Sequence, residues 1–148
     1  MKMKKLAVLM TLVLMLCTMP LTAFAAQPAS PYAASMPATP NWDITADASS
    51  NLYVDGTDVT CLSKVNGSVI VTSITIEQTL QKQGLFWIWS KPDKDSEWTE
   101  TVNDFSAMVY NEKYNLESGK YRLKSVFTLK TDSGKSEKIT IYSEIVEI

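Results

Sequence analysis

Residues 116–130 read LESGKYRLKSVFTLK, and this stretch indicates the fold class most clearly. It opens with a turn sequence, Glu117 to Gly119. From Tyr121 to Leu129 every second residue is apolar except Ser125. Alternation with a period of two indicates a strand with one buried face, because successive side chains of a strand point to opposite sides of the sheet. The stretch therefore predicts a turn followed by one long strand.

The same period recurs between turn sequences along residues 42–148. Further strands are expected over residues 52–54, 59–65, 69–81, 85–89, 98–102, 105–109 and 138–148. Asp55-Gly56 and Asn66-Gly67 are suited to the positive φ of tight hairpin turns, and Lys82-Gln83-Gly84 also predicts a turn. No segment in this region has the helical period. Strands at this spacing, with turns between them, are typical of an antiparallel β-sandwich or barrel, so we expect an all-β domain.

Residues 1–41 differ in composition from the rest of the chain. Three lysines precede a run from Leu6 to Leu16 that is apolar except for Thr11, and small residues at Ala23 and Ala25 fit a signal-peptidase site. This run is shorter than the roughly 20 apolar residues that span a bilayer. We therefore expect a signal peptide over residues 1–25 and a secreted, extracellular product.

Two further regions follow the expected signal peptide. Residues 26–41 contain four prolines among Ala, Ser and Thr and no charged residue, so they are expected to form a semi-rigid, Pro-rich spacer. Residues 42–148 are then the β-sandwich domain. An exported domain without a disulfide is more typical of a bacterium than of an animal.

Charge and cysteine content restrict the partners. The expected signal peptide holds three of the 14 basic residues and none of the 16 acidic ones, which leaves 11 basic and 16 acidic residues, a net charge of −5. Such a domain lacks the excess of Lys and Arg that neutralises phosphates, so we expect neither nucleic acid nor, after cleavage, a membrane as its partner. Cys61 is the only cysteine beyond Cys17. It is expected to be a buried apolar residue, with an inter-chain disulfide as the alternative.

The segment from Leu116 to Leu123 resembles the tyrosine corner of immunoglobulin-like and fibronectin type III-like sandwiches. In that corner a tyrosine at the start of strand F, here Tyr121, bonds to backbone a few residues upstream. Cys61 stands about where immunoglobulins have the strand B cysteine, but its partner position is Leu123, and Ile74 and Ile76 lie on strand C where a Trp is expected. The resemblance implies an immunoglobulin-like sandwich without its disulfide.

The order of segments along the chain is similar to that of a family of small secreted proteins of Gram-positive Firmicutes, a family of unknown function. The motifs that carry the resemblance are Val59-Thr60-Cys61, Ile74-x-Ile76-x-x-x-Leu80-Gln81-Lys82, a Trp-bearing strand, Ser118 to Lys124, and Gly134 to Ser143. The resemblance implies export and a β-sandwich. It brings no activity, cofactor or ligand.

The chain lacks the residues that most kinds of catalytic site require. Without a histidine, Ser-His-Asp and Cys-His catalysis and histidine-ligated metals are excluded. A pair of carboxylates can hydrolyse glycosides. The acidic candidates near the aromatic strand are Asp93, Asp95, Glu97, Glu100 and Asp104. A small sandwich rarely has the deep cleft that such a site needs, so we expect a solvated loop and no enzyme or cofactor.

Asp93, Asp95 and Glu97 stand at alternate positions, as the oxygen ligands of calcium loops do. Trp98 occupies the sixth position, where those loops need Gly, and the twelfth is Asp104 in place of Glu. The sequence therefore predicts at most a weak metal site of another geometry, with an uncoordinated acidic loop as the alternative.

Four aromatic residues form the candidate ligand-binding site: Phe86, Trp87, Trp89 and Trp98. In a strand, Trp87 and Trp89 would share one face, and Phe86 and Ile88 the other, so one pair is expected in the core and the other in solvent. Exposed rings stack on sugars in carbohydrate-binding sandwiches, and exposed apolar patches mark interaction surfaces. The alternative is that Trp87 and Trp89 lie in the core while the spacer or Trp42 covers the others.

Together these features favour a secreted, non-catalytic binding or surface-interaction module for an extracellular protein or glycan. A secreted effector, such as an antimicrobial or inhibitor protein, is the alternative from another class. A glycoside-active enzyme is disfavoured by the missing residue types.

Overall fold

The computed structural model describes residues 42–148, and the expected signal peptide (1–25) and spacer (26–41) lie outside the described residues. Nine strands and one 3-10 turn make up the regular structure of the described part. They are β1 (Thr45–Asp55), β2 (Asp58–Gly67), β3 (Val71–Gln83), η1 (Leu85–Trp87), β4 (Trp89–Ser90), β5 (Glu97–Val102), β6 (Ser106–Lys113), β7 (Lys120–Thr131), β8 (Ser136–Tyr142) and β9 (Val146–Glu147). The prediction of an all-β domain is confirmed.

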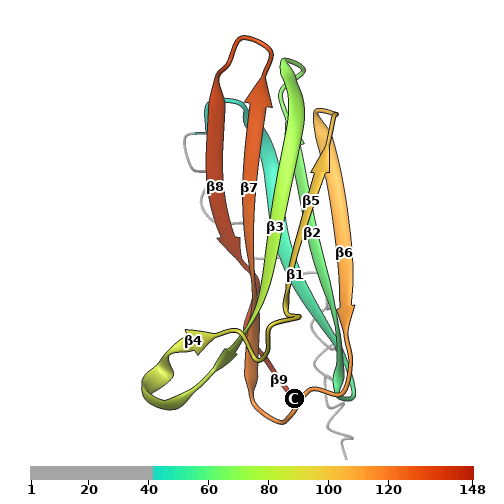
Figure 1. Ribbon diagram of the computed structural model, residues 1–148, viewed down its shortest axis with the longest axis vertical. Coiled ribbons are helices and arrows are strands. Elements are labelled where there is room, and N and C mark those ends of the chain that lie inside the picture. Colours follow the sequence, from blue (N-terminus) through green and yellow to red (C-terminus); the bar gives the residue numbers. More distant parts are fainter. Residues whose placement is uncertain (1–41) are drawn as a thin grey trace, which may run out of the picture. The chain divides into compact units, whose positions relative to one another are not determined.

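The strands form two antiparallel sheets packed on one another (Figure 1). One sheet has the order β1-β2-β6. In the other, β3 and β7 lie side by side, β4 and β5 pair with the outer edge of β3, and β8 and β9 pair with β7. If β1, β2, β3, β6, β7 and β8 are equated with strands A, B, C, E, F and G, the sheets are the ABE and CFG sheets of immunoglobulin-type sandwiches. The predicted antiparallel sandwich is therefore present.

The tyrosine corner lies where the chain crosses from β6 in one sheet to β7 in the other. Tyr121 is 1% exposed, and its hydroxyl donates to the carbonyl oxygen of Glu117 at 2.7 Å. Cys61 and Leu123, the two expected disulfide positions, are both fully buried in one apolar cluster. The corner therefore forms without the disulfide that accompanies it in antibody domains.

Two apolar clusters fill the space between the sheets. The first contains Ile44, Ala48, Val65, Val71, Ile74, Ile76, Ala107, Val109, Phe127, Leu129 and Ile141. The second contains Leu52, Val59, Cys61, Leu80, Leu116, Tyr121 and Leu123. Both clusters draw on β1, β2, β3 and β7, so each of these strands carries one stretch of each cluster.

A layer of polar side chains separates the two clusters, one from each of five strands. Its members are Ser50, Ser63, Gln78, Asn111 and Ser125. Ser125 shares hydrogen bonds with Ser50 (2.8 Å) and Ser63 (2.7 Å). The amide nitrogen of Gln78 donates to Ser63, and its amide oxygen accepts from Asn111, both at 2.7 Å. Because every member has a partner, the layer can be buried without the cost of unpaired polar groups.

The connection between β2 and β3 is not the hairpin that Asn66-Gly67 predicted. Both residues belong to β2, and β2 and β3 lie in different sheets. The chain crosses between the sheets through a turn in which the N–H of Val71 donates to Ser68. Gly67 is required for space, because a Cβ at this position would lie 2.7 Å from a methyl carbon of Val71.

The first strand begins earlier than the sequence predicted, and Glu137 of β8 holds its start. The carboxylate of Glu137 accepts hydrogen bonds from the backbone N–H groups of Asp43, Ile44 and Thr45, at 2.8 to 3.1 Å, and from the Thr45 hydroxyl at 2.7 Å. Burial acts to raise the pKa of Glu137, but these hydrogen bonds outweigh it and keep the pKa below its ordinary value.

Candidate functional site

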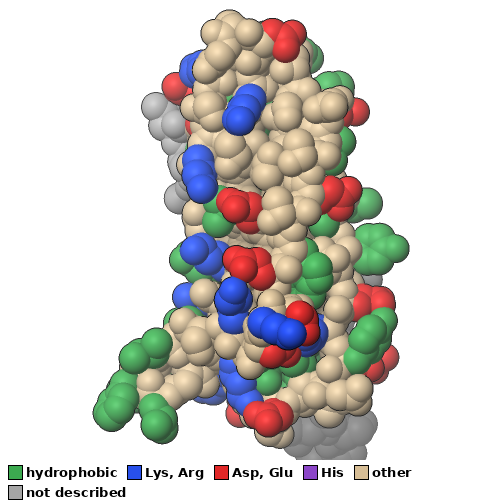
Figure 2. Space-filling view, in the orientation of Figure 1, with side chains coloured by type: hydrophobic (Ala, Val, Ile, Leu, Met, Phe, Trp, Pro, Cys, Tyr) green, Lys and Arg blue, Asp and Glu red, His purple; other side chains and the backbone are tan. Residues whose placement is uncertain are grey.

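The hairpin formed by the end of β3 and by β4 projects beyond the sandwich (Figure 1). We call residues 81–90 the arm and residues 85–88 its tip. All four tip side chains are apolar and exposed: Leu85 83%, Phe86 84%, Trp87 78% and Ile88 64%. Figure 2 shows hydrophobic side chains gathered at the end of this projection. The tip is the longest run of consecutive exposed apolar residues in the part of the chain that the structure describes.

The backbone of the tip is a tight turn in an unfavourable conformation. The N–H of Ile88 donates to Leu85 at 3.3 Å, and the N–H of Gly84 donates to Ile88 at 2.8 Å. Phe86 and Trp87 occupy the centre of this turn with φ of 58° and 59°. Turns with two positive φ values favour Asn and Gly, and a bulky residue there costs about 1–3 kcal/mol. Phe86 and Trp87 are therefore exposed and in an unfavourable backbone conformation, so neither side chain stabilises the fold by burial.

The strand predicted over residues 85–89 is wrong. The pairs Lys82–Ser90 and Gln83–Trp89 are the last of the ladder between β3 and β4, which leaves residues 84–88 as the loop. The turn was predicted at Lys82-Gln83-Gly84, but it lies further along the chain, at residues 84–88. Since the loop does not alternate between two faces, Phe86, Trp87 and Ile88 are all exposed, and neither predicted pairing of the side chains occurs.

Trp89 lies at the base of the arm and is only partly exposed. The guanidinium carbon of Arg122, on β7, is 4.3 Å from the centre of the Trp89 ring and 4.2 Å from the centre of the Tyr142 ring. The Nε of Arg122 donates to the side-chain oxygen of Gln81 at 2.9 Å. These cation–π contacts and this hydrogen bond connect the arm to β7 and β8.

Trp98 is not part of the tip. It lies on β5, partly buried against the second apolar cluster. Trp42, the other residue expected to cover the aromatic site, packs against the first cluster. The structure therefore keeps only Phe86 and Trp87 of the four candidate aromatic residues together, and brings Leu85 and Ile88 to them.

The acidic candidates are engaged with lysines and with their own loop. One oxygen of Asp93 accepts from the Asp95 N–H (2.9 Å), the Ser96 hydroxyl (2.8 Å) and the Lys113 ammonium (2.9 Å). The hydrogen bond from Lys113, followed by that from Ser96, lowers the pKa of Asp93. Glu97 pairs with Lys91 at 2.8 Å, and the hydrogen bond from that lysine lowers the pKa of Glu97. No three Asp, Glu or Cys side chains within residues 42–148 are grouped as a metal ion requires.

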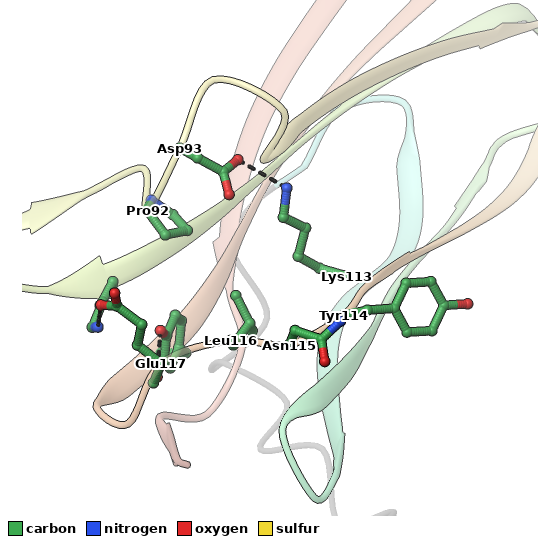
Figure 3. Close-up of a pocket in the computed structure, with 9 residues that line it drawn as sticks. Pro92, Asp93, Lys113, Tyr114, Asn115, Leu116 and Glu117 are labelled. Carbon is green, nitrogen blue, oxygen red and sulfur yellow. Dashed lines mark hydrogen bonds and ion pairs between the residues drawn. The ribbon is translucent and has the colours of Figure 1, made fainter.

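A pocket of about 250 Å³ lies where the loop after β4 meets the connection between β6 and β7 (Figure 3). Its lining consists of Lys82, Pro92, Asp93, Lys113, Tyr114, Asn115, Leu116, Glu117 and Tyr121. Two ion pairs line this pocket, one between Asp93 and Lys113 and one between Lys82 and Glu117, each at 2.9 Å. Each of the two carboxylates that line the pocket is thus bound to a lysine.

Cys61 is free and buried, as the sequence predicted. Burial raises the pKa of its thiol to about 12. A thiol that stays protonated is a poor nucleophile and a poor metal ligand.

Comparison of the chain with models of protein families, with curated proteins and with solved structures found no match. The resemblance to small secreted Firmicutes proteins stays a prediction. Among residues 42–148, no helix has the length and apolar character needed to cross a membrane. Fold and site together define a β-sandwich with a tyrosine corner and a projecting apolar hairpin.

Proposed function

We propose that this chain is a secreted, non-catalytic binding module that engages its partner through the tip of the arm. The observation that carries this proposal is the exposure of four consecutive apolar side chains, 64–84% each, at the end of a projecting hairpin. Exposed contiguous apolar side chains are unfavourable in water and mark interaction surfaces. The turn supports the same proposal, because residues with unfavourable backbone angles cluster at functional sites.

The projecting shape of the tip and the few accessible rings around it disfavour a sugar-stacking platform and a concave small-ligand site. A sugar-stacking platform would need several accessible rings, but Arg122 lies over the ring of Trp89, and Trp98 is packed against the core. The tip is a projection, whereas sites for small ligands are concave. The partner must therefore supply a cavity or a surface that deforms around the tip.

Photo-crosslinking in producing cells tests the proposal whatever the chemical class of the partner. The photoreactive residue p-benzoylphenylalanine replaces Phe86 in one variant and Tyr110, which is 68% exposed on β6, in a control. This residue reacts with the C–H bonds of proteins, glycans and lipids. We expect adducts from position 86 that are absent from position 110. No adduct at position 86, or the same adducts from both positions, would contradict the proposal.

A further inference from the structure

We infer that the surface engaged by the tip is the interfacial region of a phospholipid bilayer. This inference rests on the proposed function and names its partner. It departs from the expectation, based on net charge, that no membrane is bound. The reason is that the arm differs in charge and polarity from the domain as a whole.

The side chains of the tip suit the boundary between headgroups and acyl chains. Leu, Phe and Ile gain free energy on leaving water, and Trp is enriched at membrane–water interfaces. Peripheral proteins bury such side chains about 5–10 Å into this boundary. Leu85, Phe86, Trp87 and Ile88 are consecutive at the end of the arm, so all four can enter together while the sandwich stays in water.

The arm and the segments next to it contain lysine but no acidic residue. Between Glu77 and Asp93 the chain has no acidic residue but has Lys82 and Lys91. Both lysines have carboxylate partners, Glu117 and Glu97.

Arg122, at the base of the arm, has no ion-pair partner within residues 42–148, and its guanidinium lies between two rings. Arg is suited to phosphate, and Trp and Tyr to the headgroup level. Lipid phosphates would thus meet Arg122, Trp89 and Tyr142 once the tip has entered.

The pocket of a second copy of the chain is a poor site for the tip. The pocket between the loop after β4 and the β6–β7 connection is lined by two ion pairs, so an apolar tip would remove these charges from water without replacing their interactions. A bilayer needs no preformed cavity, because it deforms around a small projection. A protein with an apolar pocket is the remaining competitor, and vesicle binding combined with crosslinking separates it from lipid.

The test uses the chain as purified from producing cells and vesicles of phosphatidylcholine, with or without one-third phosphatidylglycerol. The test variant is Phe86→Asn with Trp87→Gly, which removes both rings but supplies the residues that this turn favours, so that the hairpin is retained. The control is Met108→Ser with Tyr110→Ser, which removes two side chains exposed 66% and 68% on the other sheet. All variants share the same segment before residue 42, so any binding by that segment is common to them.

We expect wild type to cosediment with both kinds of vesicle, with a blue shift of tryptophan emission. The test variant should lose about 100-fold in vesicle affinity, because it no longer buries two aromatic side chains. The control should stay within about twofold of wild type. Arg122→Gln should lower binding to the vesicles with phosphatidylglycerol more than binding to those without it.

Equal binding by wild type and the test variant, or no binding by wild type, would overturn the lipid inference. If position 86 then still crosslinks to a protein or glycan, the binding function stands and only the lipid partner is rejected. If position 86 forms no adduct either, both proposals fail.

Discussion

At the scale of single residues, Glu137 is the ionisable group whose charge supports the fold most directly. Its carboxylate accepts four hydrogen bonds from residues 43–45, and they lower its pKa despite burial. A carboxylate with a lower pKa in the folded state contributes stability above its unfolded pKa. That stability is lost as the pH falls through the folded value.

Glu137→Gln should therefore lower the free energy of unfolding at pH 7 by about 1–3 kcal/mol, because a neutral amide oxygen accepts these hydrogen bonds less strongly than a carboxylate. The difference from wild type should shrink as the pH falls below about 4.3, the ordinary pKa of Glu. Urea unfolding at several pH values measures both effects. A difference that is the same at pH 7 and pH 3 would show that the charge of Glu137 is not what stabilises the start of β1.

At the scale of elements, the arm has a regular ladder but a turn sequence that does not suit its turn. The pairs between β3 and β4 place Phe86 and Trp87 at positive φ, where Asn-Gly is the favoured pair. Phe86 and Trp87 therefore occupy a position where they weaken the hairpin. This conflict between local preference and structure is typical of sites under functional selection.

The variant Phe86→Asn with Trp87→Gly should strengthen the hairpin by about 1 kcal/mol, because relief of two unfavourable φ angles exceeds the entropy cost of one Gly. The amides of Gly84 and Ile88, which both donate within the turn, should exchange with solvent more slowly than in wild type. The amide of Leu116, bonded to Thr57 far from the arm in sequence, serves as the control and should not change. Faster exchange at Gly84 and Ile88 would mean that the aromatic pair stabilises the turn.

At the scale of the whole molecule, the polar layer connects both sheets between the two apolar clusters. Gln78 is fully buried and bonds to Ser63 of the opposite sheet and to Asn111. Its loss would take hydrogen bonds from polar groups on two strands, because Ser63 would keep only Ser125 as a side-chain partner and the Asn111 amide would lose its bond to Gln78. A buried polar group that loses its partner costs more than the net gain of an ordinary hydrogen bond.

Gln78→Leu should lower the free energy of unfolding by about 1–3 kcal/mol in denaturant titrations. The triple variant that adds Ser63→Ala and Asn111→Leu should recover part of this loss, since the groups that lost a hydrogen bond are then removed as well. Thr75→Ala on the outer face of the same strand, where Thr75 bonds only to Thr101 through its side chain, should change stability by about 0.5 kcal/mol at most. An unchanged stability for Gln78→Leu would show that the layer is not needed to join the sheets.

The sequence showed part of this layer without showing how it is assembled. Ser63 and Ser125 interrupt apolar alternation on the faces predicted to be buried, and Gln78 falls between Ile76 and Leu80 at core-face spacing. Each looks like a single interruption of one strand. Only the pairing of strands and the packing of the sheets place the five polar residues at one level, where they satisfy one another.

Local sequence patterns were enough to predict most of the strands, the hairpin turn after Asp55 and the tyrosine corner, because alternation, the pair Asp55-Gly56 and a Tyr four residues after Glu117 are local features. The site, in contrast, depends on tertiary structure. The ladder between β3 and β4 places the turn at Phe86 and Trp87, although neither residue type favours positive φ. Trp98 packs against the second apolar cluster, and Arg122 lies over the ring of Trp89. Strand register and the choice of which aromatic side chain is buried depend on contacts between residues distant in the chain, and a local pattern does not contain those contacts.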